Sequence, residues 1–204
     1  MRNLFDPSVL GWPQLRDSLH VYVIPDQDFA STAQPAMDVI ARFDICATVA
    51  SQWRHATITR IPWWRNEVDE QRLLRFSRTL DALAAETSAF TLTMTGPVVH
   101  ENSVGMDAPS DGQWQRLLDG TRSAAEQVFG AERPPAAAPD RPHVSLGYGI
   151  IDADSAALQL ALEPIDIDAE LTVDAMHFVA VHQDPTAGTF TWDPISIHRL
   201  QSPR

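Results

Sequence analysis

Two different periods organise the hydrophobic positions along the chain. Between residues 68 and 86, the large apolar side chains share one helical face: Leu73, Phe76, Leu80 and Leu83. This spacing predicts a helix over 68–86. From Phe90 to Thr95, apolar residues alternate strictly with threonines, which predicts a strand with one buried face and one polar face. The change of period within a few residues indicates a chain that mixes helices and strands.

Shorter patterns supply the remaining elements. Runs rich in β-branched or aromatic residues predict further strands at 20–24, 53–61, 98–100, 104–108, 143–150, 171–173, 176–182 and 189–198. Pro62 is predicted to end the strand at 53–61. Helices are predicted at 35–50, 110–130 and 153–162, and the second of these begins with a Ser110–Gln113 capping box. The Pro- and Ala-rich stretch 131–142 is predicted to be an exposed loop. Interleaved helices and strands define an α+β or α/β protein, and the late hairpins favour antiparallel pairing.

Composition narrows the classes of partner. The 204 residues are 44% hydrophobic, and 27 acidic residues against 15 basic ones give a net charge of −12. Because duplex binding needs a basic surface that displaces counterions, we expect no duplex nucleic-acid partner, and any nucleotide ligand should be small or held by a local group of arginines. Every basic residue is Arg, which excludes chemistry that needs a lysine amine, such as a P-loop or a pyridoxal phosphate Schiff base.

Cysteine usage and hydropathy bear on location. Cys46 is the only cysteine, so the sequence can form neither an internal disulfide nor a cysteine-based zinc cage. The N-terminal residues lack the apolar run of a signal peptide, and no stretch approaches the length of a membrane span. We therefore expect a soluble cytoplasmic protein without a membrane partner.

Candidate chemistry lies in two short segments of the predicted strands. His55 and His143 are each followed two residues later by a hydroxyl residue, Thr57 and Ser145. Residues two apart in a strand share a face, so each strand presents an imidazole beside a hydroxyl. Two such histidines can act on one phosphorus as general base and general acid, while the hydroxyls bond its non-bridging oxygens. The arrangement requires no metal and no cofactor.

Strand parity also predicts where the neighbouring side chains point. Tyr148 is expected in the core, and the glycines Gly147 and Gly149 are expected to clear the His143 face for a ligand. Arg54 and Arg60 are expected to point away from the histidines and to be solvated or paired with acids.

Four further residues are candidates for substrate binding. Trp53 shares the parity of His55, and Arg141 shares that of His143, so the first is a candidate to stack on a base and the second to contact phosphate. Trp63 and Trp64 follow Pro62 and are candidates for a rim around a nucleotide. The alternatives are a packing aromatic for Trp53 and a surface loop or lid for the Trp pair.

The paired segments resemble the motifs of the 2H phosphoesterase superfamily, which is also called LigT-like or 2′-5′ RNA ligase-like. Its two H-x-T/S-x motifs match His55-Ala56-Thr57-Ile58 and His143-Val144-Ser145-Leu146, and the order of elements is similar over most of the chain. Arg54 departs from the apolar residue that is common before the first motif. The resemblance implies an α+β fold over 1–204, one bilobed domain in which two pseudosymmetric antiparallel-sheet lobes with outer helices flank a central cleft.

The resemblance also implies an activity. It makes His55 and His143 the catalytic pair, with Thr57 and Ser145 holding phosphate oxygens, in a metal-independent phosphodiesterase that acts on a cyclic phosphate, a small nucleotide or an RNA 3′-end. Which histidine is base and which is acid stays open. The alternatives are a non-catalytic nucleotide-binding module and a 2′-5′ RNA ligase. We expect a monomer.

Overall fold

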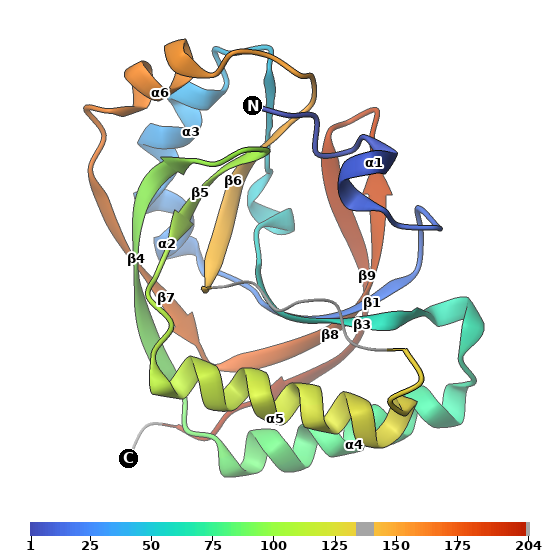
Figure 1. Cartoon of the computed structure of the whole chain (residues 1–204). Coiled ribbons are helices and arrows are strands. Elements are labelled where there is room, and N and C mark those ends of the chain that lie inside the picture. Colours follow the sequence, from blue (N-terminus) through green and yellow to red (C-terminus); the bar gives the residue numbers. More distant parts are fainter. Residues whose placement is uncertain (134–140, 203–204) are drawn as a thin grey trace.

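One strongly curled sheet forms the framework of the protein (Figure 1). The structure is a computed structural model that describes residues 1–133 and 141–202. Nine strands follow the order β7-β4-β5-β6-β3-β1-β8-β9, with β2 paired to β6, and all these pairings are antiparallel. The strands are β1 (Ser18–Val23), β2 (Cys46–Thr48), β3 (Ala56–Trp64), β4 (Phe90–Val99), β5 (Ser103–Asp107), β6 (His143–Gly149), β7 (Ile167–Val173), β8 (Ala175–Asp184) and β9 (Thr189–Arg199).

The sheet has two halves that meet at one narrow joint. β7, β4, β5 and β6 with β2 form one half, and β3, β1, β8 and β9 form the other. Between β6 and β3 the pairing consists of a single pair of residues, Ala56 and Val144. These are the second residues of the two histidine motifs, so the joint brings the motifs together. This arrangement confirms the predicted mixed helix and strand fold with two antiparallel-sheet lobes.

Helices cover the outside of the curled sheet (Figure 1). α4 (Glu70–Glu86) and α5 (Gly112–Phe129) pack on each other and on the half that contains β3, whereas α2 (Gln27–Thr32), α3 (Gln34–Ile40) and α6 (Ala156–Leu162) cover the half that contains β6. The main core lies between these helices and the sheet, and Phe76, Leu80 and Trp114 are fully buried in it. No helix of the described residues is long and apolar enough to cross a membrane.

The ends of the two long helices follow from capping groups. The Asp69 carboxylate accepts the backbone N–H of Arg72 at the start of α4, within the helix predicted at 68–86. The Asp111 carboxylate accepts two backbone N–H groups at the start of α5, so the predicted cap, Ser110, is wrong by one residue. Gly130 ends α5 with a positive φ of 80°, which an L side chain rarely adopts.

Two predicted boundaries are wrong for physical reasons. The helix predicted over 35–50 ends at Ile40, and Cys46–Thr48 instead forms β2, because the edge of β6 offers it backbone partners. Pro62 does not end β3, which continues to Trp64. It lies where the register with β1 shifts, so its missing N–H interrupts no regular ladder. Of the predicted loop 131–142, residues 134–140 lie outside the described residues.

The segment before β1 is hydrogen-bonded to both halves and crosses the inner side of the sheet. It contains the short helix α1 (Pro7–Leu10), which the sequence patterns do not predict. The backbone N–H of Leu4 donates to Gly149 of β6, and the carbonyl of Leu15 accepts from Gln183 of β8. Trp12 lies between these anchors and packs against Phe190 and His20. This segment therefore forms one wall of the inner side.

Candidate active site

The two histidine motifs lie side by side at the joint of the sheet. Antiparallel pairing of Ala56 with Val144 sets His55 next to Ser145 and Thr57 next to His143 in the same register. In addition to burial, the charge of a protonated His143 lowers the pKa of His55, so the two imidazoles lie close to each other. The structure therefore brings all four predicted catalytic residues together, one imidazole and one hydroxyl from each half.

Both histidines are held by the same kind of hydrogen bond. His55 Nδ1 lies 3.0 Å from the carbonyl oxygen of Trp53, and His143 Nδ1 lies 3.3 Å from that of Arg141. A carbonyl only accepts, so each Nδ1 carries the proton and donates it. In the neutral ring Nε2 is then the free basic nitrogen on both histidines. The site therefore contains two histidines with a free Nε2, as general acid and general base catalysis by one pair of residues requires.

Aromatic rings enclose His55. The Tyr22 ring stacks on it with a centroid distance of 3.9 Å, and Trp192 meets it edge-on at 5.1 Å. Trp53 packs against Trp192 at 4.9 Å, so the predicted Trp53 does lie at the site, in the turn η1 (Ser51–Trp53) rather than in a strand. Burial lowers the pKa of His55 to about 4, against the opposing effect of its bond to the Trp53 carbonyl.

A polar cluster surrounds His143 instead. Asp107 pairs with His143 across β5 and β6, and its carboxylate accepts from His100 Nε2 at 3.2 Å and from Arg141 Nε at 2.8 Å. Burial lowers the pKa of His143, while the Arg141 carbonyl and the Asp107 charge oppose that shift. Arg141 therefore lies beside the second motif as predicted, with its guanidinium already paired to an acid.

Equivalent bulges interrupt both motif strands and correct the predicted side-chain directions. The register between β1 and β3 leaves Ile58 unpaired, and that between β5 and β6 leaves Leu146 unpaired. Each is the fourth residue of its motif. An extra residue reverses the alternation of faces beyond it, so the regular alternation assumed from the sequence is wrong after each motif.

The reversal changes the environment of the β6 residues. Tyr148 is buried as expected, but in the inner aromatic cluster with Phe5 and Phe190, and its hydroxyl is hydrogen-bonded to Ser145. Burial raises the pKa of Tyr148 to about 12, so this hydroxyl is neutral. Gly147 does not clear space for a ligand. A Cβ there would lie 2.6 Å from Cys46 Sγ on the opposite face.

The two arginines of the first motif strand are also placed differently from the prediction. Arg54 is buried rather than solvated, and its guanidinium donates to the carbonyls of Val49 and Ala30. Arg60 lies beyond the Ile58 bulge and faces inward, where its guanidinium stacks over Trp12 at 4.6 Å. Neither arginine pairs with an acid among the described residues.

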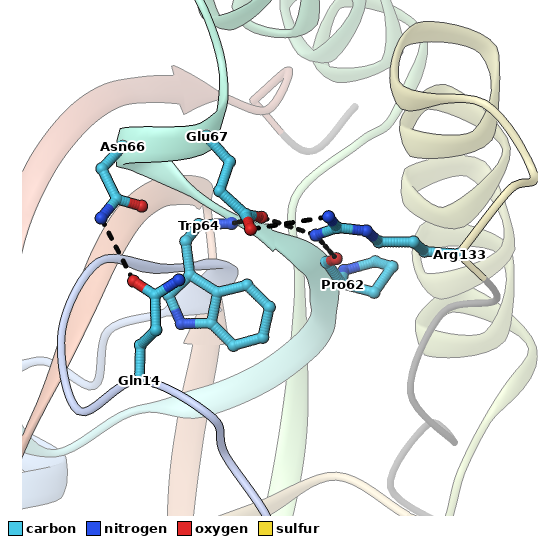
Figure 2. Close-up of polar contacts among 6 residues, drawn as sticks. All are labelled: Gln14, Pro62, Trp64, Asn66, Glu67 and Arg133. Carbon is cyan, nitrogen blue, oxygen red and sulfur yellow. Dashed lines mark hydrogen bonds and ion pairs between the residues drawn. The ribbon is translucent and has the colours of Figure 1, made fainter.

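The predicted Trp rim is divided between two environments. Trp63 packs against the main core with Arg133 over its ring at 4.0 Å, so the structure does not bring it to the histidines. Trp64 is buried at the far end of β3, where its backbone N–H donates to Glu67, whose carboxylate also binds Arg133 (Figure 2). A cavity of about 500 Å³ beside Arg133 opens between α5 and β3 and contains neither motif histidine.

Sequence patterns do not reveal every residue of the site. Tyr22 and Trp192 come from β1 and β9, far from either motif, and no local signal in the sequence links them to His55. The alternation of side chains along a strand predicts the face of the sheet on which Tyr22 or Trp192 lies. It does not predict which residue of another strand each one contacts. Among the described residues, no three His, Cys, Asp or Glu side chains are placed to share a metal ion.

Burial of His55 makes stability depend on pH. Its pKa is about 4 in the folded protein and about 6.5 in an unfolded chain, so the unfolded state binds the proton more readily. The stability linked to this shift is complete above pH 6.5 and is lost as the pH falls toward 4. Urea unfolding at pH 7 and at pH 4.5 measures how much the free energy of unfolding decreases between the two pH values. We expect this decrease to be smaller in His55→Gln than in the wild type by about 2 kcal/mol. Equal decreases in both proteins would contradict the lowered pKa of this partly buried imidazole.

The curled sheet, its outer helices and the paired histidine motifs at the joint define a LigT-like fold. No protein-family model and no curated protein matches the sequence. Solved structures do match. TT0787 of Thermus thermophilus is 17% identical with a TM-score of 0.72, over 92% of this chain and 100% of that one.

The E. coli protein LigT gives two further matches. Its apo form is 15% identical with a TM-score of 0.63, over 92% of this chain and 99% of LigT. Its complex with 3′-AMP is 14% identical with a TM-score of 0.64 over the same shares. These likenesses confirm the predicted LigT-like fold.

Proposed function

We propose that this protein is a 2H-type phosphodiesterase that opens a cyclic phosphate, or cleaves a phosphodiester, of a small nucleotide or an RNA 3′-end. The observation that carries the proposal is the pair of histidines at the joint, each with its Nδ1 bonded to a backbone carbonyl and a hydroxyl residue two positions later. His55 and His143 are the catalytic pair, and Thr57 and Ser145 bind the substrate.

The chemistry follows from two bases on either side of one phosphorus. One neutral histidine accepts a proton from water through Nε2, and the water oxygen forms a bond to phosphorus. The bond from phosphorus to a ribose oxygen breaks, and the protonated second histidine supplies the proton that this oxygen takes up. The hydroxyls of Thr57 and Ser145 donate to the non-bridging oxygens, whose charge grows in the transition state. One water is consumed, and the cyclic diester becomes a monoester.

The surroundings of the two histidines support their roles as general base and general acid. Burial keeps the pKa of both rings below the ordinary value, so both are neutral bases at pH 7 before substrate binds. A phosphate anion between them favours protonation of one ring, because an opposite charge close by stabilises the cation. LigT has been solved with 3′-AMP, and a nucleotide monophosphate has the chemistry of the expected product.

Phosphorus NMR tests the proposal. We expect the purified protein to convert at least one 2′,3′-cyclic nucleotide to a monophosphate in excess EDTA, because none of the proposed steps uses a metal ion. The chemical shift of the product reports which ester bond opens. A signal that persists for every cyclic nucleotide and for RNA with a 2′,3′-cyclic end would contradict the phosphodiesterase. Tight binding without turnover would then favour a nucleotide-binding module, and joined RNA ends a ligase.

A further inference from the structure

We infer that Arg60 is a second anion-binding residue of this site, and that the substrate carries a second phosphate in addition to the one held between the histidines. The inference rests on the proposed function for the identity of the first phosphate. It goes beyond that proposal in naming a substrate class, a nucleotide with two separate phosphate groups, and a residue that selects it.

The bulge at Ile58 places Arg60 on the inner side of the sheet. Arg60 pairs in register with His20, and Thr57 pairs with Tyr22, so both face the same side as the ring that stacks on His55. Without the bulge, Arg60 would point among the outer helices. Thr57 and Arg60 pair with Tyr22 and His20, which are two residues apart, so the two positions are about 7 Å apart along the strand, roughly the span of one nucleoside.

The charge of Arg60 is not offset by any described residue. Its guanidinium is stacked on Trp12 and lies 5.8 Å from the Trp64 ring. Its Nε is buried and has no hydrogen-bond partner, and its side chain forms no ion pair in the part of the chain that the structure describes. The protein has a net charge of −12, so acidic partners are plentiful elsewhere, yet none of those described is placed here.

The two polar rings beside Arg60 do not supply a negative charge. Burial raises the pKa of the Tyr22 hydroxyl well above its usual value, so it remains a neutral phenol. Burial and the neighbouring Arg60 charge lower the pKa of His20 well below its usual value, so that imidazole is also neutral. A partly buried cation among neutral rings favours an anionic ligand, because an opposite charge offsets the desolvation of the guanidinium.

A continuous row of rings links this cation to the catalytic histidine. Trp12 lies 5.3 Å from His20, His20 lies 5.2 Å from Tyr22, and Tyr22 stacks on His55 at 3.9 Å. A nucleoside that spans the row would place one phosphate at His55 and the other at Arg60. The equivalent position of the second motif strand is Tyr148, which is neutral. The second anion is therefore bound beside the first motif, at Arg60, and not beside the second.

Calorimetry with two matched sets of nucleotides tests the inference without relying on turnover. The probes are the 3′-monophosphates and the 3′,5′-bisphosphates of adenosine, guanosine, cytidine and uridine. We expect the wild type to bind the bisphosphate of at least one nucleoside about 10- to 100-fold more tightly than its monophosphate, the range that follows from hydrogen bonds to a charged group. In Arg60→Gln this ratio should fall to near one. Arg60→Lys should retain part of it, because the charge remains while the planar fork is lost.

Controls separate a binding role from a structural one. Arg72→Gln removes a guanidinium that stacks on Trp63 at the outer side of the same strand, and it should leave the preference unchanged. Thermal unfolding checks that each variant folds, and Arg60→Met, which keeps an apolar side chain over Trp12, replaces the Gln variant if that one unfolds.

A wild-type ratio near one, or a ratio unchanged in Arg60→Gln, overturns the inference. Failure to bind any of the eight nucleotides also overturns this inference, whereas the proposed function depends on the turnover measured by phosphorus NMR. A clear bisphosphate preference without turnover of any cyclic phosphate overturns only the phosphodiesterase.

Discussion

Replacing either motif histidine by alanine lowers kcat by roughly 10²- to 10⁴-fold, the range for loss of a general acid or base. His55→Ala and His143→Ala each remove one of the two proton-transfer groups, and the reaction needs both in one turnover. The double variant should therefore be hardly slower than either single one, because the residues act as a unit. Initial rates with the cyclic nucleotide identified by phosphorus NMR provide the measurement.

A matched control removes a histidine outside the site. His182 Nδ1 accepts the backbone N–H of Asp17, and its Nε2 lies 3.3 Å from Asp193. His182→Ala deletes an imidazole that is hydrogen-bonded through both nitrogens, and we expect it to keep its activity. Circular dichroism should show that both motif variants keep the folded state. Normal turnover in either motif variant would refute the catalytic assignment.

Much of the fold follows from periodicity in the sequence. The alternation from Phe90 to Thr95 predicts one buried face, and the structure buries Phe90, Leu92 and Met94 while Thr91 is exposed. The apolar face of α4 is equally clear. The segment Cys46–Thr48 could not be assigned in this way, because so short a run contains no period, and its strand forms only through backbone pairing with β6.

The candidate site is predicted less completely than the fold. His143 and Ser145 lie in regular register in β6 as predicted, whereas His55 directly precedes β3 rather than lying within the predicted strand. Beyond the fourth residue the inserted bulge reverses the faces, and strict alternation then fails for Arg60 and for its counterpart in β6. A bulge is set by the register with the neighbouring strand, and that information is not local to the motif.

Replacing Thr57 by valine should lower kcat by about 10²-fold, the effect of removing one preorganised donor to a developing oxyanion. Valine keeps the shape and the β-branched character of threonine, so the fold should be unaffected. Thr59 provides the matched control, since it lies two residues farther along the same strand and regular alternation would put both hydroxyls on one face.

The bulge separates the two threonines. Thr57 pairs with Tyr22 of the inner face, whereas Thr59 pairs with Val21, which is buried in the main core. The Thr59 hydroxyl is itself buried without a hydrogen-bond partner. Thr59→Val should therefore leave kcat unchanged and should hold or raise the melting temperature, because it removes an unsatisfied buried polar group. Equal losses of activity in both variants would show that the strand is regular in solution, with Arg60 on its outer side.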